Sequence, residues 1–184
     1  MRTLEVRRHS WTLKDRQHGD PHLSPAGVRL ARAVGDTLPS MAYVAVGDQP
    51  RHRETAEAMG YAVDEQVAWP SGYVEGEVRH HDQWSWDAPY ARYAELLRTG
   101  GGLTAVAGEH LAHWRRILAE VPEGGAALVV SSGGSIEPAL VAAFPQADHE
   151  SWGEALHHLD GATLTVDGDS FMDLELRRLA SIRA

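Results

Sequence analysis

Apolar and polar positions alternate along the chain in two patterns, one typical of strands and one typical of helices. Short apolar or alternating runs predict strands at residues 3–7, 43–46, from 62–63 onward, and at 126–130. Apolar residues at three- and four-residue spacing predict helices at 24–38, 51–59, 104–121 and 135–143. Ser24 and Pro25 form a typical helix start, an N-cap followed by proline. Residues 162–166 and 171–177 predict a closing hairpin around the turn at 167–169.

This order of elements predicts a three-layer α/β/α fold with a mainly parallel central sheet. The whole chain, residues 1–184, is expected to form a single domain. Residues 65–102 lack clear periodicity and are rich in tryptophan and tyrosine, so we interpret them as an aromatic insertion or lid with a short helix near 90–98. In sheets of this type, sites form beyond the carboxyl ends of the strands.

Composition narrows the function classes. The 184 residues are 43% hydrophobic and include no cysteine, which excludes disulfides, thiol nucleophiles and cysteine-bound metal. A formal charge of -9 argues against nucleic-acid binding, which needs a basic face. No apolar run approaches the roughly 20 residues that span a bilayer, and the first residues lack a secretory pattern. We therefore expect a cytoplasmic protein without membrane association, and the preference for arginine over lysine suggests a bacterial source.

Three strand ends carry residues suited to anion chemistry. Arg8 and His9 follow the first strand, where a guanidinium can bind a phosphoryl oxygen beside a nucleophilic imidazole. Arg51 opens the helix after the second long strand, and a helix N-terminus favours anions. Ser132 and Gly133 lie in a Ser-Ser-Gly-Gly turn into the last helix, where small residues allow a ligand close to the backbone.

The motifs at these strand ends resemble those of the histidine phosphatase superfamily, the phosphoglycerate-mutase-like group. The matching segments are Val6-Arg7-Arg8-His9-Ser10, His22-Leu23-Ser24-Pro25-Ala26-Gly27, Arg51-His52-Arg53-Glu54-Thr55-Ala56 and Val129-Val130-Ser131-Ser132-Gly133-Gly134. The family patterns are Arg-His-Gly, a Leu-Thr/Ser-x-x-Gly helix start, Arg-Ala-x-Gln/Glu-Thr-Ala and Val-Ser-His-Gly-Gly. The resemblance covers nearly the whole chain and implies the family's phosphoglycerate-mutase-like fold.

The resemblance implies a metal-independent phosphatase that acts on a small phosphorylated molecule and needs no cofactor. His9 would become phosphorylated, and Arg8 and Arg51 would bind the phosphoryl oxygens. A carboxylate after the third strand would protonate the leaving oxygen, with Glu77 preferred over Glu75. The rival candidates for this proton donor are Asp82 and the pair His80-His81.

The sequence departs from the family pattern at Ser132, where the family has a second histidine. A serine donates one neutral hydrogen bond and carries no positive charge. Loss of one preorganised donor typically costs about 10²–10³-fold in rate. His52, or one of the pair His157-His158, is a candidate replacement. Ser132 is compatible with a repurposed or inactive protein, a rewired site, or an engineered substitution.

Several other residues bear on the site. Asp48, in a Gly-Asp pair where Ser-Ser or Ser-Pro is usual, would repel a dianion if it faced the pocket. Trp11 lies two residues from His9 and is a candidate substrate contact, and His18 and His22 are candidate rim residues. His110 and His113 have metal-compatible spacing without an evident third ligand, so we interpret them as an exposed polar helix face.

Three functions compete at this point. The first is a phosphatase that works through phospho-His9. The second is acid–base chemistry on another small anion in the same cationic pocket, and the third is a non-catalytic, phosphate-binding pseudoenzyme. The pairing of His9 with Arg8 and Arg51 favours the first two, whereas Ser132 and Asp48 weaken the first.

Overall fold

The computed structural model describes residues 1–13 and 21–179, which contain a six-stranded sheet in the order β3-β2-β4-β1-β5-β6. The strands are β1 (Arg2–Arg8), β2 (Tyr43–Gly47), β3 (Glu65–Val67), β4 (Ala126–Ser131), β5 (Gly161–Asp167) and β6 (Ser170–Arg177). Strands β3, β2, β4 and β1 are parallel, and the β5–β6 hairpin joins β1 in antiparallel pairing. The predicted α/β class with a mainly parallel sheet is confirmed.

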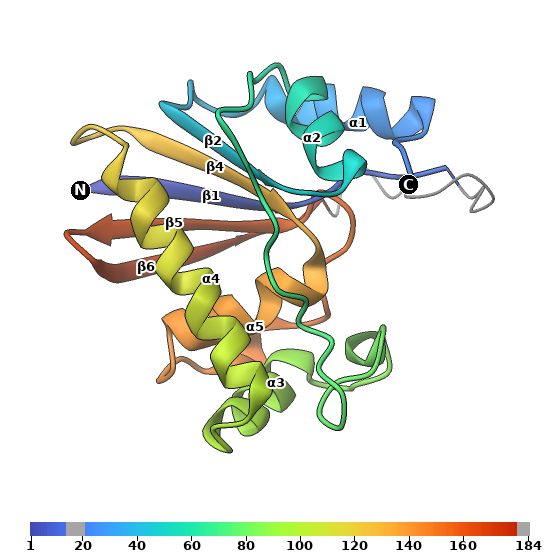
Figure 1. Cartoon of the computed structure of the whole chain (residues 1–184), viewed down its shortest axis with the longest axis vertical. Coiled ribbons are helices and arrows are strands. Elements are labelled where there is room, and N and C mark those ends of the chain that lie inside the picture. The colour runs from blue at the N-terminus through green and yellow to red at the C-terminus, as the bar shows by residue number, and fades with distance from the viewer. Residues whose placement is uncertain (14–20, 180–184) are drawn as a thin grey trace.

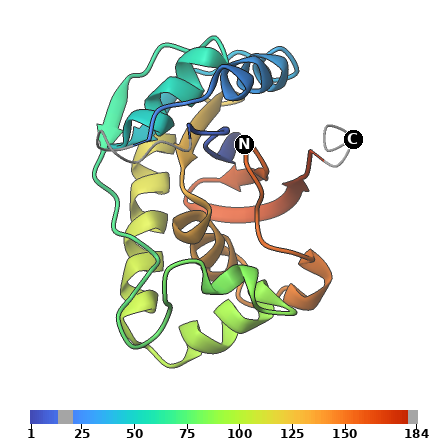
Figure 2. The ribbon, with the colours of Figure 1, turned by 90° about the vertical axis from the view of Figure 1, so that its right-hand side faces the viewer.

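Helices cover both faces of this sheet (Figures 1 and 2). They are α1 (Pro25–Gly35), α2 (Pro50–Ala58), α3 (Pro89–Arg98), α4 (Gly102–Ala119) and α5 (Gly133–Ala143), with short 3-10 turns η1 (Asp82–Trp84) and η2 (His149–Trp152). One apolar core lies between the sheet and α4 and α5, around the fully buried Trp114 and Leu140. A second core lies between the other face and α1 and α2, around Ala31 and Val46. No helix in the described ranges has the length and apolar character required to cross a bilayer.

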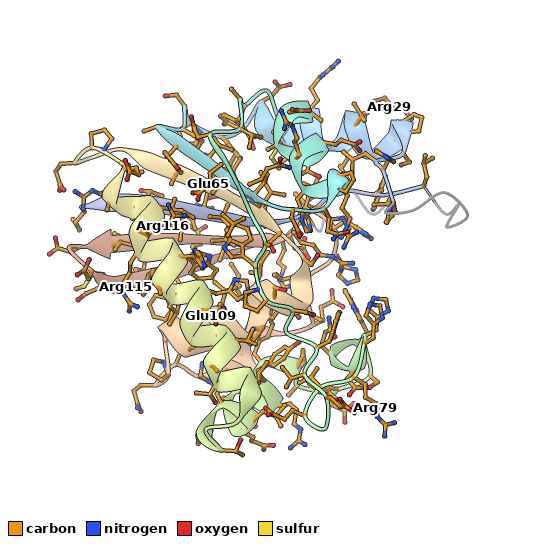
Figure 3. All side chains as sticks on the ribbon, in the orientation of Figure 1. Arg29, Glu65, Arg79, Glu109, Arg115 and Arg116 are labelled. Carbon is orange, nitrogen blue, oxygen red and sulfur yellow. The ribbon has the colours of Figure 1, made fainter. Side chains whose placement is uncertain are left out.

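The start of α1 confirms the predicted cap. The Ser24 hydroxyl oxygen accepts the Gly27 N–H at 3.0 Å, and Pro25 occupies the first turn. The third strand, in contrast, lies at Glu65–Val67 and not at residues 62–63. Asp64 hydrogen-bonds with Val44 through both its backbone and its side chain, so pairing with β2 begins only after it. This strand is short and polar at the sheet edge, where Glu65 pairs with Arg116 of α4 (Figure 3), and hydrophobic periodicity therefore located it poorly.

The aromatic segment after β3 descends from the sheet to α3 (Figure 1). It builds a small core of its own, in which Val78, Tyr90 and Tyr93 are almost fully buried against Leu103 of α4 and Val141 of α5. The predicted short helix near residues 90–98 is present as α3. Much of the aromatic content of this segment therefore serves packing.

The contact between α1 and α2 gives a stability prediction. A methyl group on Gly35 would lie 2.1 Å from the Met59 carbonyl oxygen, so the two helices would have to separate. We expect Gly35→Ala to lower the free energy of unfolding by about 1–3 kcal/mol, the usual cost of overpacking, as measured by urea denaturation.

Gly108 on the exposed side of α4 is the matched control, because a methyl group there meets nothing within 4 Å. Gly108→Ala should raise the free energy of unfolding by about 0.5–1 kcal/mol, since glycine is entropically costly inside a helix. Equal effects at the two positions would contradict the close packing at Gly35.

Candidate active site

The backbone that carries His9 is fixed from three sides. The His9 N–H donates to the Ser131 carbonyl at 2.9 Å, which ties the end of β1 to the end of β4. The next residue, Ser10, donates its N–H to Thr55 Oγ1 of α2 and its hydroxyl to the Gly27 carbonyl of α1. Serine at position 10 thus anchors the strand end between two helices.

His9 is neutral and presents one free nitrogen. Its ring is only 8% exposed, and Nδ1 lies 2.8 Å from the Ser10 carbonyl oxygen. Because a carbonyl only accepts hydrogen bonds, Nδ1 carries the hydrogen and Nε2 keeps its lone pair. Burial lowers the pKa of His9 well below its usual value, and the Arg8 charge lowers this pKa further. The arrangement is that of a nucleophile or base and not of a cation.

Two more imidazoles flank His9. The His52 ring centroid lies 5.7 Å from that of His9, and the His158 ring lies 5.3 Å away in an edge-on arrangement. Burial, with Arg51 adding to it, lowers the pKa of His52 to about 3. Burial and Arg8 lower the pKa of His158 to about 4. The structure therefore brings together three neutral imidazoles beside the two candidate phosphoryl-binding arginines.

A cavity of about 340 Å³ opens beside this cluster at the strand ends. It is lined by Gly47, Asp48, Gln49, Arg51, His52, Trp69, Ser71, Tyr73, His80, Ser131, Ser132 and Ser135. Arg8 and His9 border it through Ser131 and His52 and do not line it themselves. The cavity has a polar floor made by the strand ends and an aromatic and imidazole wall made by Trp69, Tyr73 and His80.

Arg8 is positioned by the loop before β5. Its Nη1 donates to the Leu156 carbonyl at 2.6 Å, and its guanidinium lies over the Trp84 ring at 5.2 Å. The Leu156 N–H in turn donates to Glu137 Oε1 of α5 at 2.6 Å. The Leu156 backbone thus links the two side chains, because its carbonyl binds Arg8 and its N–H binds the buried Glu137.

Glu137 is a buried carboxyl that the sequence analysis did not identify. It is fully buried, and this desolvation raises its pKa to about 7, with the Leu156 N–H and Arg8 opposing the shift. Its second oxygen accepts the Tyr93 hydroxyl at 3.4 Å. The sequence signal that could have identified Glu137 is its position as the single acidic residue in the apolar run 136–144. A charged residue on a helix that is buried on all sides needs a partner.

The same loop places His158 through a strained residue. Leu159 has φ 62°, the left-handed region that a leucine adopts only when its surroundings impose it. Leu159 N–H donates to the Arg8 carbonyl, and Arg8 N–H donates to the Asp160 carbonyl. Arg178 donates to the Trp152 and Glu154 carbonyls of this loop. These bonds fix His158 against His9.

The N-terminus of α5 lies at the cavity floor. Ser132 is the N-cap residue, but its side chain makes no cap hydrogen bond and instead lies 2.9 Å from His52 Nε2. Gly133 allows Arg8 to approach, since a methyl group there would meet Arg8 Cδ at 3.2 Å. Gly134 likewise makes room for the Tyr73 ring. The free N–H groups of a helix start favour an anion at this point.

The structure places Glu77, the expected proton donor, at the start of α4. Glu77 accepts the N–H groups of Gly102 and Leu103 at 2.6 and 3.0 Å, so it caps α4 and does not line the cavity. Glu75 is exposed, and Asp82 accepts the Arg79 N–H within its own turn.

Of the named candidates, His80 lines the cavity in the described part of the chain. Its ring stacks between Tyr73, at 4.6 Å, and His81, at 3.8 Å. The sequence analysis had ranked it behind the two glutamates.

Other expected residues are placed as follows. Trp11 is 38% exposed and does not line the cavity. Asp48 does line it and is itself exposed. His157 packs edge-on against Trp84, and His22 pairs with Glu54. His18 lies outside the described residues.

The expected exposed polar face at His110 and His113 is wrong for His110. This residue is 1% exposed, and its Nε2 lies 3.0 Å from the Pro70 carbonyl oxygen, where it ties the aromatic segment to α4. In residues 1–13 and 21–179, no group of three or more histidine, aspartate and glutamate side chains is arranged to bind a metal ion.

Comparison with known proteins agrees with this geometry. The family model described as "Histidine phosphatase superfamily (branch 1)" matches residues 6–172. No curated protein matches the sequence.

Among solved structures, the chain is similar to the phosphoserine phosphatase of Entamoeba histolytica in complex with 3-phosphoglyceric acid. The TM-score is 0.67 and the identity 15%, over 98% of each chain. It is also similar to a mycobacterial glucosyl-3-phosphoglycerate phosphatase complexed with VO3. Here the TM-score is 0.65 and the identity 19%, over 96% of this chain and 98% of that one. At these identities the two structures establish the shared fold.

The neutral imidazoles predict a pH-dependent stability. Below about pH 6.5 the unfolded chain protonates histidines that the folded chain keeps neutral, so the free energy of unfolding should fall with falling pH, by up to about 1.4 kcal/mol per pH unit for each such group. Glu137 acts in the opposite direction between its ordinary 4.5 and about 7, because the folded state binds its proton more tightly. Three imidazoles outweigh one carboxyl, so stability should rise with pH in this window.

Urea denaturation between about pH 5 and 6.5 measures this slope. His52→Gln should flatten it and Glu137→Gln should steepen it. A slope that His52→Gln leaves unchanged would mean that the pKa of His52 is the same in the folded and the unfolded chain.

Proposed function

The chain belongs to the histidine phosphatase superfamily, and we propose that it hydrolyses a small phosphorylated molecule through a phosphohistidine at His9. One observation carries the proposal most directly. His9 is buried and neutral, its Nδ1 is engaged by Ser10, and its Nε2 is free beside Arg8. A lone pair of this kind next to a guanidinium is what attack on a phosphoryl group requires.

The proposed reaction has two steps. His9 Nε2 attacks phosphorus, the bond from phosphorus to the substrate oxygen breaks, and that oxygen takes a proton from an acid in the cavity wall. Water then attacks the phosphohistidine and gives a proton back to that acid, the phosphorus–nitrogen bond breaks, and inorganic phosphate leaves. Positive charge for the phosphoryl oxygens comes from Arg8, Arg51 and the N-terminus of α5 at Gly133. Ser132 and His52 add hydrogen-bonding groups at the cavity floor.

The size and lining of the cavity support a small substrate. A volume of about 340 Å³ accommodates a phosphoryl group and a modest organic part. Beyond the strand ends, that organic part would contact the wall of Trp69, Tyr73 and His80. Asp48, which also lines the cavity, disfavours additional negative charge on the substrate. We place Trp11 outside this first ring of contacts.

The central test is phosphorylation of His9. Wild-type protein incubated with p-nitrophenyl phosphate and with a panel of small phosphate esters should turn over and, after rapid quenching, carry acid-labile, base-stable phosphate on His9. His9→Ala should lose turnover by at least about 10³-fold, since a covalent route requires the nucleophile.

Two outcomes would replace the proposal. Tight phosphate binding without turnover would indicate a binding protein. Turnover of a non-phosphorylated anion would indicate acid–base chemistry at His9. An unchanged rate in His9→Ala would also refute the proposed intermediate.

A second test concerns the acid. We propose His80 for this role because it lines the cavity, whereas Glu77 caps α4. His80→Asn should reduce kcat/KM about 10²-fold for an alkyl phosphate, whose leaving oxygen needs a proton, and much less for p-nitrophenyl phosphate.

Glu77→Gln is the matched comparison. It should lower the unfolding midpoint while leaving the ratio of the two rates unchanged, because a cap affects the helix and not the leaving group. A leaving-group-dependent loss in Glu77→Gln, absent from His80→Asn, would return the role to the glutamate.

A further inference from the structure

We infer that His52 and Ser132 act as one unit that binds a phosphoryl oxygen, with the imidazole supplied from α2 to a position beside His9. This inference deepens the proposed function and depends on it. It gives Ser132 a role as the partner that makes room for His52 and connects it to the substrate. Ser132 is then a functional part of the site, and the absence of a histidine at this position does not leave the site incomplete.

The contact geometry is the first support. His52 is the third residue of α2, and its Nε2 lies 2.9 Å from Ser132 Oγ across the ends of β2 and β4. The ring is 4% exposed, lines the cavity and lies 5.7 Å from the His9 ring. Because this imidazole is buried at the floor of the candidate phosphoryl site, we interpret His52 as part of the site and not as a surface residue.

Gly47 is the second support. A methyl group at Gly47 would lie 2.2 Å from His52 Nδ1, so only glycine at the end of β2 leaves space for this ring. Position 132 shows the same constraint from the other side. Ser132 Oγ lies 2.9 Å from His52 Nε2, so the γ atom of a histidine placed there in the serine rotamer would already be in contact with that ring.

These positions coincide with three departures from the family motifs named above. Gly47 stands where serine is usual, His52 where alanine is common, and Ser132 where histidine is usual. The exchange is reciprocal in side-chain size. The motifs have the large side chain at the end of β4, whereas this chain has it at the start of α2, with small residues around it. One compensated rearrangement explains all three departures, whereas a simple loss of function explains only the third.

The hydrogen-bond chemistry gives the unit its role. Ser132 is diverted from its ordinary capping contact, so the first N–H groups of α5 stay available for an anion. When the ring hydrogen is on Nδ1, it is directed at the Gly47 backbone and Ser132 donates to Nε2. When His52 instead donates through Nε2 to Ser132 Oγ, the serine hydroxyl hydrogen is free to donate to a phosphoryl oxygen. A bound dianion favours that arrangement, because it attracts donors and raises the proton affinity of the ring.

The opposite assignment, with Ser132 as a nucleophile activated by His52, fits less well. A base whose pKa is about 3 removes a proton from a serine hydroxyl poorly. Labelling of Ser132 by a fluorophosphonate probe would support that assignment and overturn the inference.

The test is a set of variants assayed for kcat/KM on p-nitrophenyl phosphate and for orthovanadate affinity. His52→Ala should lose about 10²-fold in kcat/KM, the usual effect of removing one preorganised donor. His52→Gln keeps an N–H near the Nε2 position and should retain most of the activity. Glu57→Ala, on the exposed side of the same helix, is the control and should change neither quantity.

The decisive comparison is between single and double variants. Ser132→His alone should lower activity, because two imidazoles compete for one space, and His52→Ala combined with Ser132→His should recover at least about tenfold over Ser132→His. Gly47→Ala should behave like His52→Ala, and adding His52→Ala to it should cost nothing more. Unfolding midpoints identify any variant that fails to fold, and His52→Gln then carries the comparison.

Two results would overturn the inference. One is a rise in activity for Ser132→His in the presence of His52, and the other is unchanged orthovanadate affinity in His52→Ala. Failure of the proposed function is distinguishable, because it removes wild-type turnover and phospho-His9 while the orthovanadate comparisons still report on His52 and Ser132.

Discussion

The neutrality of His9 is the constraint on which the candidate site depends. An imidazole that is to act as the proposed nucleophile beside two guanidinium groups must be kept from protonation and turned so that one nitrogen is free. Burial provides the first condition, and the Nδ1 contact with Ser10 provides the second. Both are helped by the position of β1 between β4 and β5, which keeps the end of this strand away from the edges of the sheet. The order of the strands in the sheet therefore contributes to the neutral state and the orientation of His9.

Charge balance around Arg8 follows from the same burial. A guanidinium taken out of water needs partners, and here the loop before β5 provides the Leu156 carbonyl while Glu137 lies one peptide beyond it. The carboxyl is close enough to interact with Arg8 but is directed to the Leu156 N–H. Other N–H groups of Arg8 thus stay available for a ligand, while the nearby Glu137 interacts with the arginine charge. The strain at Leu159 belongs to this arrangement, because the loop must both brace Arg8 and present His158.

The sequence predicted those features that depend on local pattern, and it missed those that depend on pairs far apart in the chain. Periodicity and turn residues predicted the helices, most of the strands and the three strand ends. The family motifs predicted that Arg8, His9 and Arg51 lie at one edge of the sheet. The cap on α4 joins Glu77 to Gly102, a pairing that no local pattern reveals. Glu137 is similar, because its partner Leu156 lies in a loop without periodicity. The spacing of Glu77 beyond Thr55 favoured it as the proton donor, whereas in the structure Glu77 caps α4 and His80 lines the cavity.

The His52–Ser132 contact shows that one motif position is best interpreted together with the residue that faces it. The proposed reaction needs a hydrogen-bond donor at one point of the candidate site, and the ends of β2 and β4 converge on that point from two sides. A side chain from either end can reach it, provided that the other end is small. A substitution at one strand end therefore has to be interpreted together with the residue that faces it. In this chain the facing residue is a buried histidine with a glycine beneath it, which favours an altered site over an empty one.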